Sequence, residues 1–304
     1  MGWWPTVEKE EEDEEVAGGG GGWRELAMAG AYVVLACRNT KAASEIANKW
    51  KEACNSKNLN VEVMELDLLS LSSVHRFTEK WMQRSKPLHV LINNAGIYKL
   101  GEPQRFSNEG IEQHMQVNHV SPALLTLLLL PSLLRAPSSR IINVNSVAHL
   151  CGTLELESWN SRIEEKKFSG LRAYADSKLV NLMFLKTLAN KLIDESKKAT
   201  IQCIAVHPGA VGTNVDHLGP IMRKAHLFWV FDSAQGARSV SFCATRDAVA
   251  ENLVKGFAYY SYTCKPDRIA SQAEDIDACF EVWKKTMEIL QLDADYVHDL
   301  LVRE

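Results

Sequence analysis

Short runs of apolar residues alternate with longer amphipathic segments along most of the chain. The apolar runs are five or six residues long and predict β-strands over residues 32–37, 61–66, 88–92, 140–144 and 201–206. The amphipathic segments predict helices over residues 41–54, 72–83, about 110–134 and 174–192, and residues 24–29 end a further helix that Gly30 closes. This alternation is typical of an α/β fold with a doubly wound parallel sheet and helices on both faces. Ligands of such folds bind at the carboxyl ends of the strands.

The first 22 residues break this pattern. Residues 8–15 are all charged, with seven acids and one lysine, and residues 18–22 are all glycine. Like charges repel and glycines have no side chain to pack, so residues 1–22 are predicted to be a disordered tail and residues 23–304 a single domain. The tail has a formal charge of −6, which leaves +2 for the other 282 residues. A nearly neutral body argues against a nucleic-acid partner.

Cysteine usage and apolar stretches restrict the class of protein further. No two of the seven cysteines have the C-x-x-C spacing of a zinc or redox site, and the nine histidines are scattered. We therefore expect free thiols and no metal. The N-terminus does not have the pattern of a signal peptide, and the most apolar stretch, residues 122–134, is too short and too interrupted to span a bilayer. These features favour a cytoplasmic protein.

The pair Tyr174 and Lys178 is the first candidate for chemistry. Residues four apart lie on the same face of a helix, so the Lys178 ammonium can lie beside the Tyr174 phenol. A free phenol has a pKa of about 10, and an adjacent cation brings it towards the range useful for acid/base catalysis. The spacing alone is common by chance, so it needs support from other positions.

Four further motifs lie at or near the predicted strand ends. Ser146 follows one strand, and a hydroxyl there could donate a hydrogen bond to a substrate oxygen. The small residues of Asn93-Asn94-Ala95-Gly96 let a ligand approach the backbone, and Asn side chains can tie neighbouring strands together. Asn118 lies inside a predicted helix, where an ordinary buried Asn is the simple interpretation. A last turn contains Pro208, Gly209 and Thr213.

Taken in their order along the chain, these motifs resemble those of the short-chain dehydrogenases/reductases, whose domain is of the Rossmann type. The resemblance covers residue 23 to the C-terminus. The stretches at residues 38–43, 113–119 and 142–147 look most like the plant Forever Young-type oxidoreductases, relatives of the retinol-dehydrogenase-like reductases.

The resemblance implies a reaction and a role for each residue. The reaction is hydride transfer between a nicotinamide cofactor and a carbonyl or alcohol. Tyr174 would donate and accept the proton, Lys178 would lower the phenol pKa and hold the nicotinamide ribose, Ser146 would orient the carbonyl, and Asn118 would hold a water. The remaining implied contacts are to the cofactor, from Asp67, Asn93, Ala95, Gly96, Pro208, Gly209 and Thr213.

Charge at the end of the second strand bears on the choice of cofactor. Sites specific for NAD(H) place an acid there, whereas this strand ends in Arg38, which suits the 2′-phosphate of NADP(H). We therefore expect NADP(H) rather than NAD(H). The apolar residues within 215–231, at the position of the family's substrate loop, fit an apolar substrate or a membrane-surface contact, and plain packing of a lid is the favoured interpretation. Phe280, Trp283, Met287 and Leu290 recur at helical spacing and are expected to pack in the core.

The sequence departs from the family at its start. The family opens with an apolar strand and a glycine-rich turn that binds the pyrophosphate. Here the acidic residues 8–15 replace that strand, and Arg24 stands where the turn requires its last glycine, so the glycines are interpreted as a linker. We expect a gap between the strands at 32–37 and 88–92. Either the sheet rearranges, or the chain is not stably folded, or the sequence is a truncated product, and the intact later motifs favour truncation.

Three hypotheses for the function remain open. The first is an NADP(H)-dependent oxidoreductase acting on an apolar carbonyl or alcohol, which the resemblance suggests is a homodimer without an expected membrane contact. The second is a non-catalytic remnant that acts as a binding or regulatory module, which the missing phosphate loop favours. The third is a sugar-nucleotide epimerase, which shares Tyr-x-x-x-Lys but fits the Asn-Asn-Ala-Gly motif less well.

Overall fold

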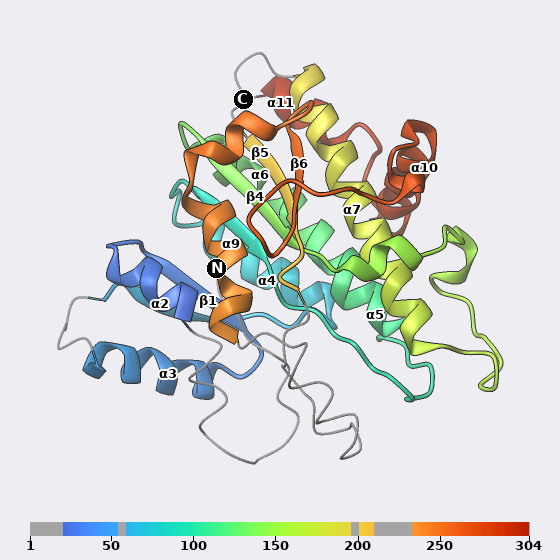
Figure 1. Cartoon of the computed structure of the whole chain (residues 1–304), viewed down its shortest axis with the longest axis horizontal. Helices are drawn as coiled ribbons and strands as arrows, with labels where there is room; N and C mark the ends of the chain where they lie inside the picture. The colour runs from blue at the N-terminus through green and yellow to red at the C-terminus, as the bar shows by residue number, and fades with distance from the viewer. Residues whose placement is uncertain (1–20, 54–58, 196–200, 210–232, 304) are drawn as a thin grey trace.

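The computed structural model describes residues 21–53, 59–195, 201–209 and 233–303, and these form an α/β fold with two parallel sheets (Figure 1). The smaller sheet pairs β1 (Val33–Cys37) with β2 (Val61–Glu65), and the larger has the order β3-β4-β5-β6. Its strands are β3 (Val90–Asn93), β4 (Ser139–Val144), β5 (Ile201–Val206) and β6 (Phe257–Tyr260). All five predicted strands are confirmed within two residues at each end, and β6 was not predicted.

The sheet is interrupted between β1 and β3. Among the described residues, β1 pairs with β2 alone and β3 with β4 alone. In β1 the Val33 N–H donates to the carbonyl of Asn60 (2.8 Å) on the β2 side, so the backbone groups of Val34 and Ala36 point the other way. The predicted gap is therefore present at the predicted place.

On the edge of β3 that faces the gap, backbone groups likewise point away from the bonded neighbouring strand. The His89 carbonyl accepts from the Arg140 N–H on the β4 side (2.8 Å), so the backbone groups of Val90 and Ile92 point towards β1. Ile92 is only 5% exposed. Unpaired backbone groups in such a place cost about 1–3 kcal/mol each. Within the part of the chain that the structure describes, side-chain packing rather than a ladder of backbone hydrogen bonds joins the two sheets.

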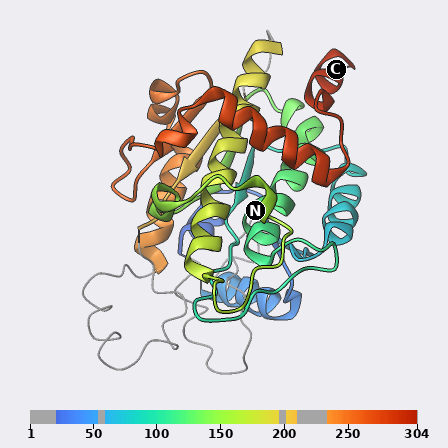
Figure 2. The same cartoon turned by 90° about the vertical axis from the view of Figure 1, so that its right-hand side faces the viewer.

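Helices cover both faces of the sheets (Figures 1 and 2). One face holds α4 (Leu71–Met82), α6 (Ser121–Leu134) and α7 (Gly170–Glu195), and α10 (Ile276–Leu290) and α11 (Tyr296–Arg303) pack outside α7. The other face holds α2 (Gly21–Met28), α3 (Thr40–Ala53) and α9 (Ser233–Thr245). The predicted doubly wound fold with helices on both faces is confirmed.

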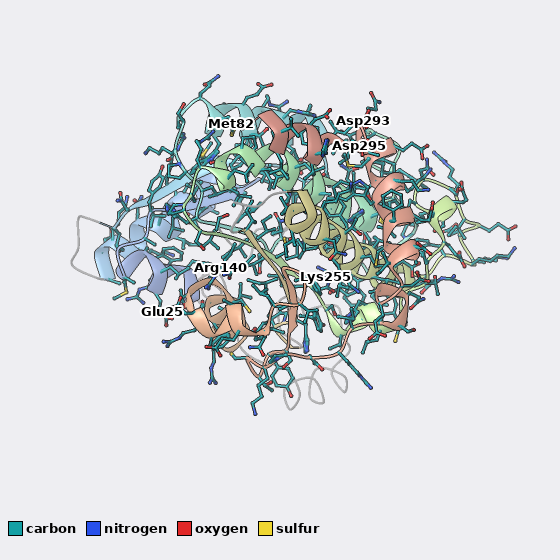
Figure 3. All side chains as sticks on the ribbon, turned by 90° about the horizontal axis from the view of Figure 1, so that it is seen from above. Glu25, Met82, Arg140, Lys255, Asp293 and Asp295 are labelled. Carbon is teal, nitrogen blue, oxygen red and sulfur yellow. The ribbon has the colours of Figure 1, made fainter. Side chains whose placement is uncertain are left out.

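Each face has its own hydrophobic core, and both cores cross the gap. The α6/α7 core includes Val34 of β1 and Leu91 of β3, and the α2/α9 core includes Leu35 and Ile92. Arg140, labelled in Figure 3, ties α9 to the larger sheet, because its guanidinium donates to Gln202 Oε1 and to the Cys243 carbonyl (both 3.0 Å).

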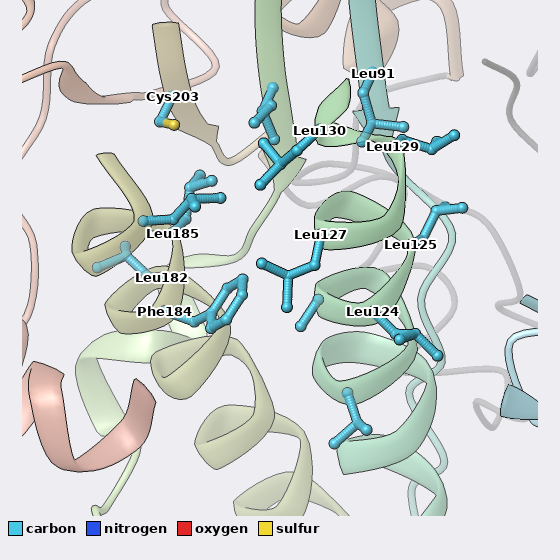
Figure 4. Packing of buried hydrophobic residues seen from close by; sticks show 14 of the residues in the cluster. Leu91, Leu124, Leu125, Leu127, Leu129, Leu130, Leu182, Phe184, Leu185 and Cys203 are labelled. Atoms are coloured by element: carbon cyan, nitrogen blue, oxygen red, sulfur yellow. The ribbon is translucent and has the colours of Figure 1, made fainter. Parts of the chain in front are cut away.

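The helix α6 is apolar on every side because it lies inside the protein. The continuous helical run Gln113–Leu134 is long and apolar enough to cross a membrane, but 83% of its most apolar window is buried in the fold. Figure 4 shows Leu127 and Leu130 opposite Phe184 and Leu185 of α7. We therefore interpret it as a core helix.

Two expectations need adjustment. The helix α2 begins at Gly21, inside the predicted tail, and Gly22 packs so closely on α9 that a Cβ there would lie 2.6 Å from Ser241 Oγ. Residues 1–20 lie outside the described part of the chain. In α10, Trp283, Met287 and Leu290 are buried as expected, whereas Phe280 is 42% exposed beneath the Lys284 ammonium.

A buried histidine in the α6/α7 core makes the fold sensitive to acid. His119 is fully buried, its Nε2 bonds to Thr286 Oγ1 (2.8 Å), and its ring packs edge-on to Trp159 and Phe184. Burial lowers its pKa from 6.5 to about 3.

We predict that His119→Asn flattens the acid limb of the stability curve. Between pH 6.5 and 3 the unfolded chain binds a proton at this histidine and the folded chain does not, so stability falls as the pH falls. The wild type should lose about 4 kcal/mol more than the variant across this window. Urea unfolding at a series of pH values measures this difference, with the exposed His75→Asn as a control; equal slopes would contradict the prediction.

Candidate active site

The carboxyl ends of β1 and β3 border a cavity of about 790 Å³. Its walls include every cofactor-binding residue predicted before residue 97, namely Arg38, Asp67, Asn93, Ala95 and Gly96. Parallel strands bring these residues together although they are up to 58 positions apart, because their carboxyl ends meet at one edge. A volume of this size lies within the range of ligand pockets in proteins.

Polar groups on the cavity wall lack partners within the protein. Asn94 Oδ1 and Gln113 Nε2 are buried and have no hydrogen-bond partner among the described residues. Arg38 is exposed, and no acidic residue in the described part of the chain pairs with it. Asp67 uses one carboxylate oxygen to accept from the Leu69 N–H (2.9 Å). Unpaired polar groups around a cavity fit a polar ligand, and a guanidinium at its end fits a phosphate.

The predicted catalytic residues converge at the carboxyl end of β4. The helix α7 carries Tyr174 and Lys178 on one face, with the Lys178 ammonium 5.7 Å from the centre of the Tyr174 ring. Ser146, two residues after the end of β4, lies close enough to the Tyr174 hydroxyl to lower the pKa of that phenol. Lys178 Nζ donates to the Val144 carbonyl (2.9 Å).

Burial shifts the acid/base properties of both groups. It lowers the pKa of the Lys178 ammonium from 10.5 to about 8. It raises the pKa of the Tyr174 phenol, while the hydrogen bond from Ser146 lowers it and the nearby Tyr98 raises it. The expected lowering of the Tyr174 pKa is therefore not found in this structure, because desolvation of the phenol is the largest cause and raises the pKa.

Asn118 lies in a short π-helical turn, η1 (Gln116–Val120), between α5 (Gln113–Met115) and α6. Its Oδ1 accepts from the Ile97 N–H (2.8 Å), and its Nδ2 donates to the Ile97 carbonyl and to Ser177 Oγ (3.0 and 2.9 Å). Turns of this kind occur frequently at functional sites. The side chain holds the loop after β3 against α7, so the water expected at Asn118 would have to bind its backbone carbonyl.

A chain of four asparagines links this turn to the sheet. Asn93 Nδ2 donates to Asn143 Oδ1 (2.8 Å), Asn143 Nδ2 to Asn181 Oδ1 (3.1 Å), and Asn181 Nδ2 to the Asn118 carbonyl (2.8 Å). The expectation that Asn side chains tie neighbouring strands is confirmed. Asn143 and Asn181 were missed, although Asn181 lies three residues after Lys178 and so on the same helix face.

Two glycines allow the close packing of the site. A Cβ at Gly96 would lie 3.0 Å from Asn118 Oδ1 and 3.2 Å from Lys178 Nζ. A Cβ at Gly152, in the segment after Ser146, would lie 2.8 Å from the Ala175 carbonyl of α7. A side chain at Gly96 would require Asn118 and Lys178 to shift by a few tenths of an ångström, and one at Gly152 would overlap the backbone of α7.

Two of the remaining predicted residues, Pro208 and Gly209, are described by the structure and do not line the cavity. They follow β5, where Gly209 has a φ of +83°. Thr213 and the apolar residues 215–231 fall outside the described residues, as do Gly18 to Gly20. The structure therefore describes the adenosine and proton-transfer parts of the predicted site, and it describes no glycine-rich phosphate loop between β1 and β3.

Comparison with known proteins agrees with this geometry. The profile of the family described as short chain dehydrogenase matches residues 19–219. The dehydrogenase/reductase SDR family member FEY of Arabidopsis thaliana is 43% identical over 294 residues, covering 92% of this chain and 77% of that protein. Retinol dehydrogenase 12 of Mus musculus is 32% identical, covering 88% and 81%.

Solved structures show the same fold. A protein from Mycobacterium paratuberculosis has a TM-score of 0.71 at 30% identity, covering 91% of this chain and 90% of that one. The NADPH-bound carbonyl reductase from chicken fatty liver has a TM-score of 0.56 at 21% identity, covering 84% and 96%.

The resemblance expected from the motifs, including that to the plant subgroup, is thereby confirmed. The profile covers more than half of the chain, and FEY is similar over nearly all of it. This chain therefore belongs to the short-chain dehydrogenase/reductase family and is an oxidoreductase of that type.

Proposed function

We propose that this protein is an NADP(H)-dependent oxidoreductase that transfers a hydride between the nicotinamide and a carbonyl or alcohol carbon of an apolar small molecule. The convergence of Ser146, Tyr174 and Lys178 at the end of β4 is the observation that carries the proposal. The names of the retinol dehydrogenase relatives and the NADPH-bound carbonyl reductase are consistent with it.

The residues present fit two parts of the cofactor, namely the adenosine with its 2′-phosphate and the nicotinamide ribose. Arg38 would bind the 2′-phosphate, Asp67 and the segment from Asn93 to Gly96 would contact the adenosine, and Lys178 would hold the nicotinamide ribose. Pro208, Gly209 and Thr213 would contact the nicotinamide side. When bound, the cofactor supplies or accepts the hydride.

Tyr174 and Ser146 would act on the substrate oxygen. Ser146 donates a hydrogen bond to the carbonyl oxygen and orients it, and Tyr174 gives that oxygen a proton as it becomes a hydroxyl. Burial keeps the phenol protonated at neutral pH, which is the form that carbonyl reduction uses. Lys178, whose pKa is about 8, remains largely charged at neutral pH and stabilises the phenolate once the proton has left.

The proposal is tested by NADPH oxidation with the purified chain and a panel of apolar aldehydes and ketones. Turnover that requires Ser146 and Lys178 supports it. A folded chain that neither binds NADPH nor turns over any substrate would instead support the non-catalytic module, and circular dichroism establishes whether the chain is folded.

The cofactor preference is tested at Arg38. We predict that Arg38→Ala weakens NADPH binding about 10–100-fold and leaves NADH binding unchanged, because only the 2′-phosphate loses a charge-assisted hydrogen bond. Fluorescence titration measures both affinities. Arg76→Ala, which removes an exposed guanidinium on α4, is the matched control and should change neither. An equal loss for both cofactors would contradict the assignment.

We further propose a cytoplasmic homodimer. All six cysteines in the described residues are free thiols, as is usual in reducing compartments. Fractionation of cells that express a tagged chain tests the location, and chloroplast import, as printed in the name of the Brassica napus relative, would overturn it. Light scattering on the purified protein tests the dimer.

A further inference from the structure

Tyr98, which follows the Asn93–Gly96 motif, lies directly against Tyr174. The two ring centres are 4.8 Å apart and the rings are tilted by 47°. Tyr98 is 49% exposed, and two neighbouring apolar residues, Leu100 and Leu171, are 58% and 51% exposed. An exposed aromatic ring in contact with the proton-donating phenol forms part of the surface that a substrate meets on its way to that phenol.

The backbone on both sides of Tyr98 is fixed by buried side chains. On one side, the Ile97 N–H and carbonyl both bond to the Asn118 amide (2.8 and 3.0 Å). On the other side, the Lys99 N–H donates to His114 Nε2 (3.0 Å). Neither of these bonds uses the Tyr98 side chain, so the loop holds its position independently of the ring.

The histidine that holds Lys99 is itself held in one tautomer. His114 Nε2 accepts from Lys99, so its proton is on Nδ1, which donates to Glu112 Oε1 (2.8 Å). Both residues are buried, at 0% and 4% exposure. Glu112 also accepts from the His114 and Met115 N–H groups and so caps the start of α5. The buried Glu112 carboxylate and His114 imidazole therefore fix the position of the loop that carries Tyr98 and Lys99.

The start of α7 fits against the same loop. A Cβ at Gly170 would overlap the Lys99 carbonyl, so the loop touches the helix where only glycine allows it. Gly170 lies four residues before Tyr174 and hence on the same helix face. Three independent contacts, from Asn118, His114 and Gly170, thus place Tyr98 on the ring of Tyr174.

We propose that Tyr98 is a positioning residue of this active site, whose ring holds the phenol of Tyr174 beside Ser146 and forms a wall of the path by which the substrate carbonyl reaches it. The inference rests on the proposed function, because it assigns Tyr174 the proton transfer. The sequence motifs did not indicate this role of Tyr98, because its position after the Asn-Asn-Ala-Gly turn does not require a polar side chain.

The Tyr98 phenol also affects the acid/base properties of its neighbour, because its proximity raises the pKa of Tyr174. The other groups facing Tyr174 are Ser146, Lys178 and, further away, Tyr259. The Lys99 ammonium points to Glu102 instead (3.2 Å).

The test compares Tyr98→Ala with Tyr98→Phe. The Ala variant is expected to lower kcat about 10–100-fold, because the Tyr174 phenol loses its orientation, and the Phe variant is expected to restore most of the rate. Gly170→Ala displaces the loop without removing any ring and is expected to lower kcat in the same direction. Wild-type kcat in both Tyr98→Ala and Gly170→Ala would overturn the proposal.

A readout without turnover separates this inference from the proposed function. In protein labelled with ¹³C at the tyrosine ζ carbons, the signal of Tyr174 is assigned by its loss in Tyr174→Phe. Its titration midpoint is expected to fall by about half a pH unit or more in Tyr98→Phe. Tyr32→Phe, which removes a comparably exposed hydroxyl (40%) at the opposite end of β1, is the control. An unchanged midpoint would overturn the coupling of the two phenols, whereas wild-type turnover by Tyr174→Phe would overturn the assignment of the proton transfer to Tyr174 and leave that coupling unaffected.

Discussion

Replacing Tyr174 by phenylalanine is expected to lower kcat/KM for carbonyl reduction by about 10²–10⁴-fold, the range that general acid catalysis contributes. The variant keeps the ring that packs on Tyr98 and removes only the hydroxyl beside Ser146. The affinity for NADPH should stay within a few-fold of the wild type, because the loss falls on the proton transfer. Steady-state kinetics and a binding titration measure the two quantities separately.

The matched control is Tyr262→Phe, which removes the hydroxyl of an exposed tyrosine whose ring packs against His207. It should keep the wild-type rate. A Tyr174→Phe variant that retains its rate would show that another group supplies the proton, and the assignment of Tyr174 would be wrong.

Hydrogen exchange is expected to separate the two sheets of the native protein. Amides of β1 and β2 should exchange about 100-fold faster than those of β4 and β5, which corresponds to a difference of about 3 kcal/mol in the free energy of opening. The reason is that β4 has a bonded strand on each side, whereas among the described residues the smaller sheet packs on the rest through side chains and pairs with no strand of the larger sheet. Mass spectrometry of peptic fragments measures the difference.

Hydrogen exchange gives the free energy of opening directly when opening and reclosing are fast compared with the chemical exchange of the amide proton. Urea should abolish the difference once both sheets unfold together, which provides the internal control. If β1 and β4 exchange at one rate in the absence of urea, the two sheets open as a single unit, and the interruption has no energetic effect.

The strands could be predicted because most of them bury a short apolar run, while β2 alternates apolar and polar residues, and both patterns are visible in the sequence alone. The strand β6 was missed because Phe257–Tyr260 is only four residues long and is followed by polar residues. The interruption of the sheet was predictable for a different reason. An acidic run cannot occupy the centre of a core, and the backbone groups of Val34 and Ile92 show the consequence.

The site could be predicted only where chemistry restricts the residue type. Tyr174, Lys178 and Ser146 are residue types that the proposed reaction requires, and the structure brings them together at the end of β4. Tyr98 and His114 carry no such signature, because their roles depend on contacts between segments that are far apart in the sequence. The sign of the Tyr174 pKa shift could not be predicted either, since burial of the phenol is a property of the folded protein.

The cavity is lined by both sheets, with Arg38 at the end of β1 and Asn93 to Gly96 at the end of β3. A ligand that bridges these residues contacts both sides of the interruption at once. By mass action, a ligand at 100 times its dissociation constant stabilises the form that binds it by about 2.7 kcal/mol. A ligand bound in the cavity would therefore hold the two sheets together. The stability of the contact between them would then depend on the concentration of that ligand.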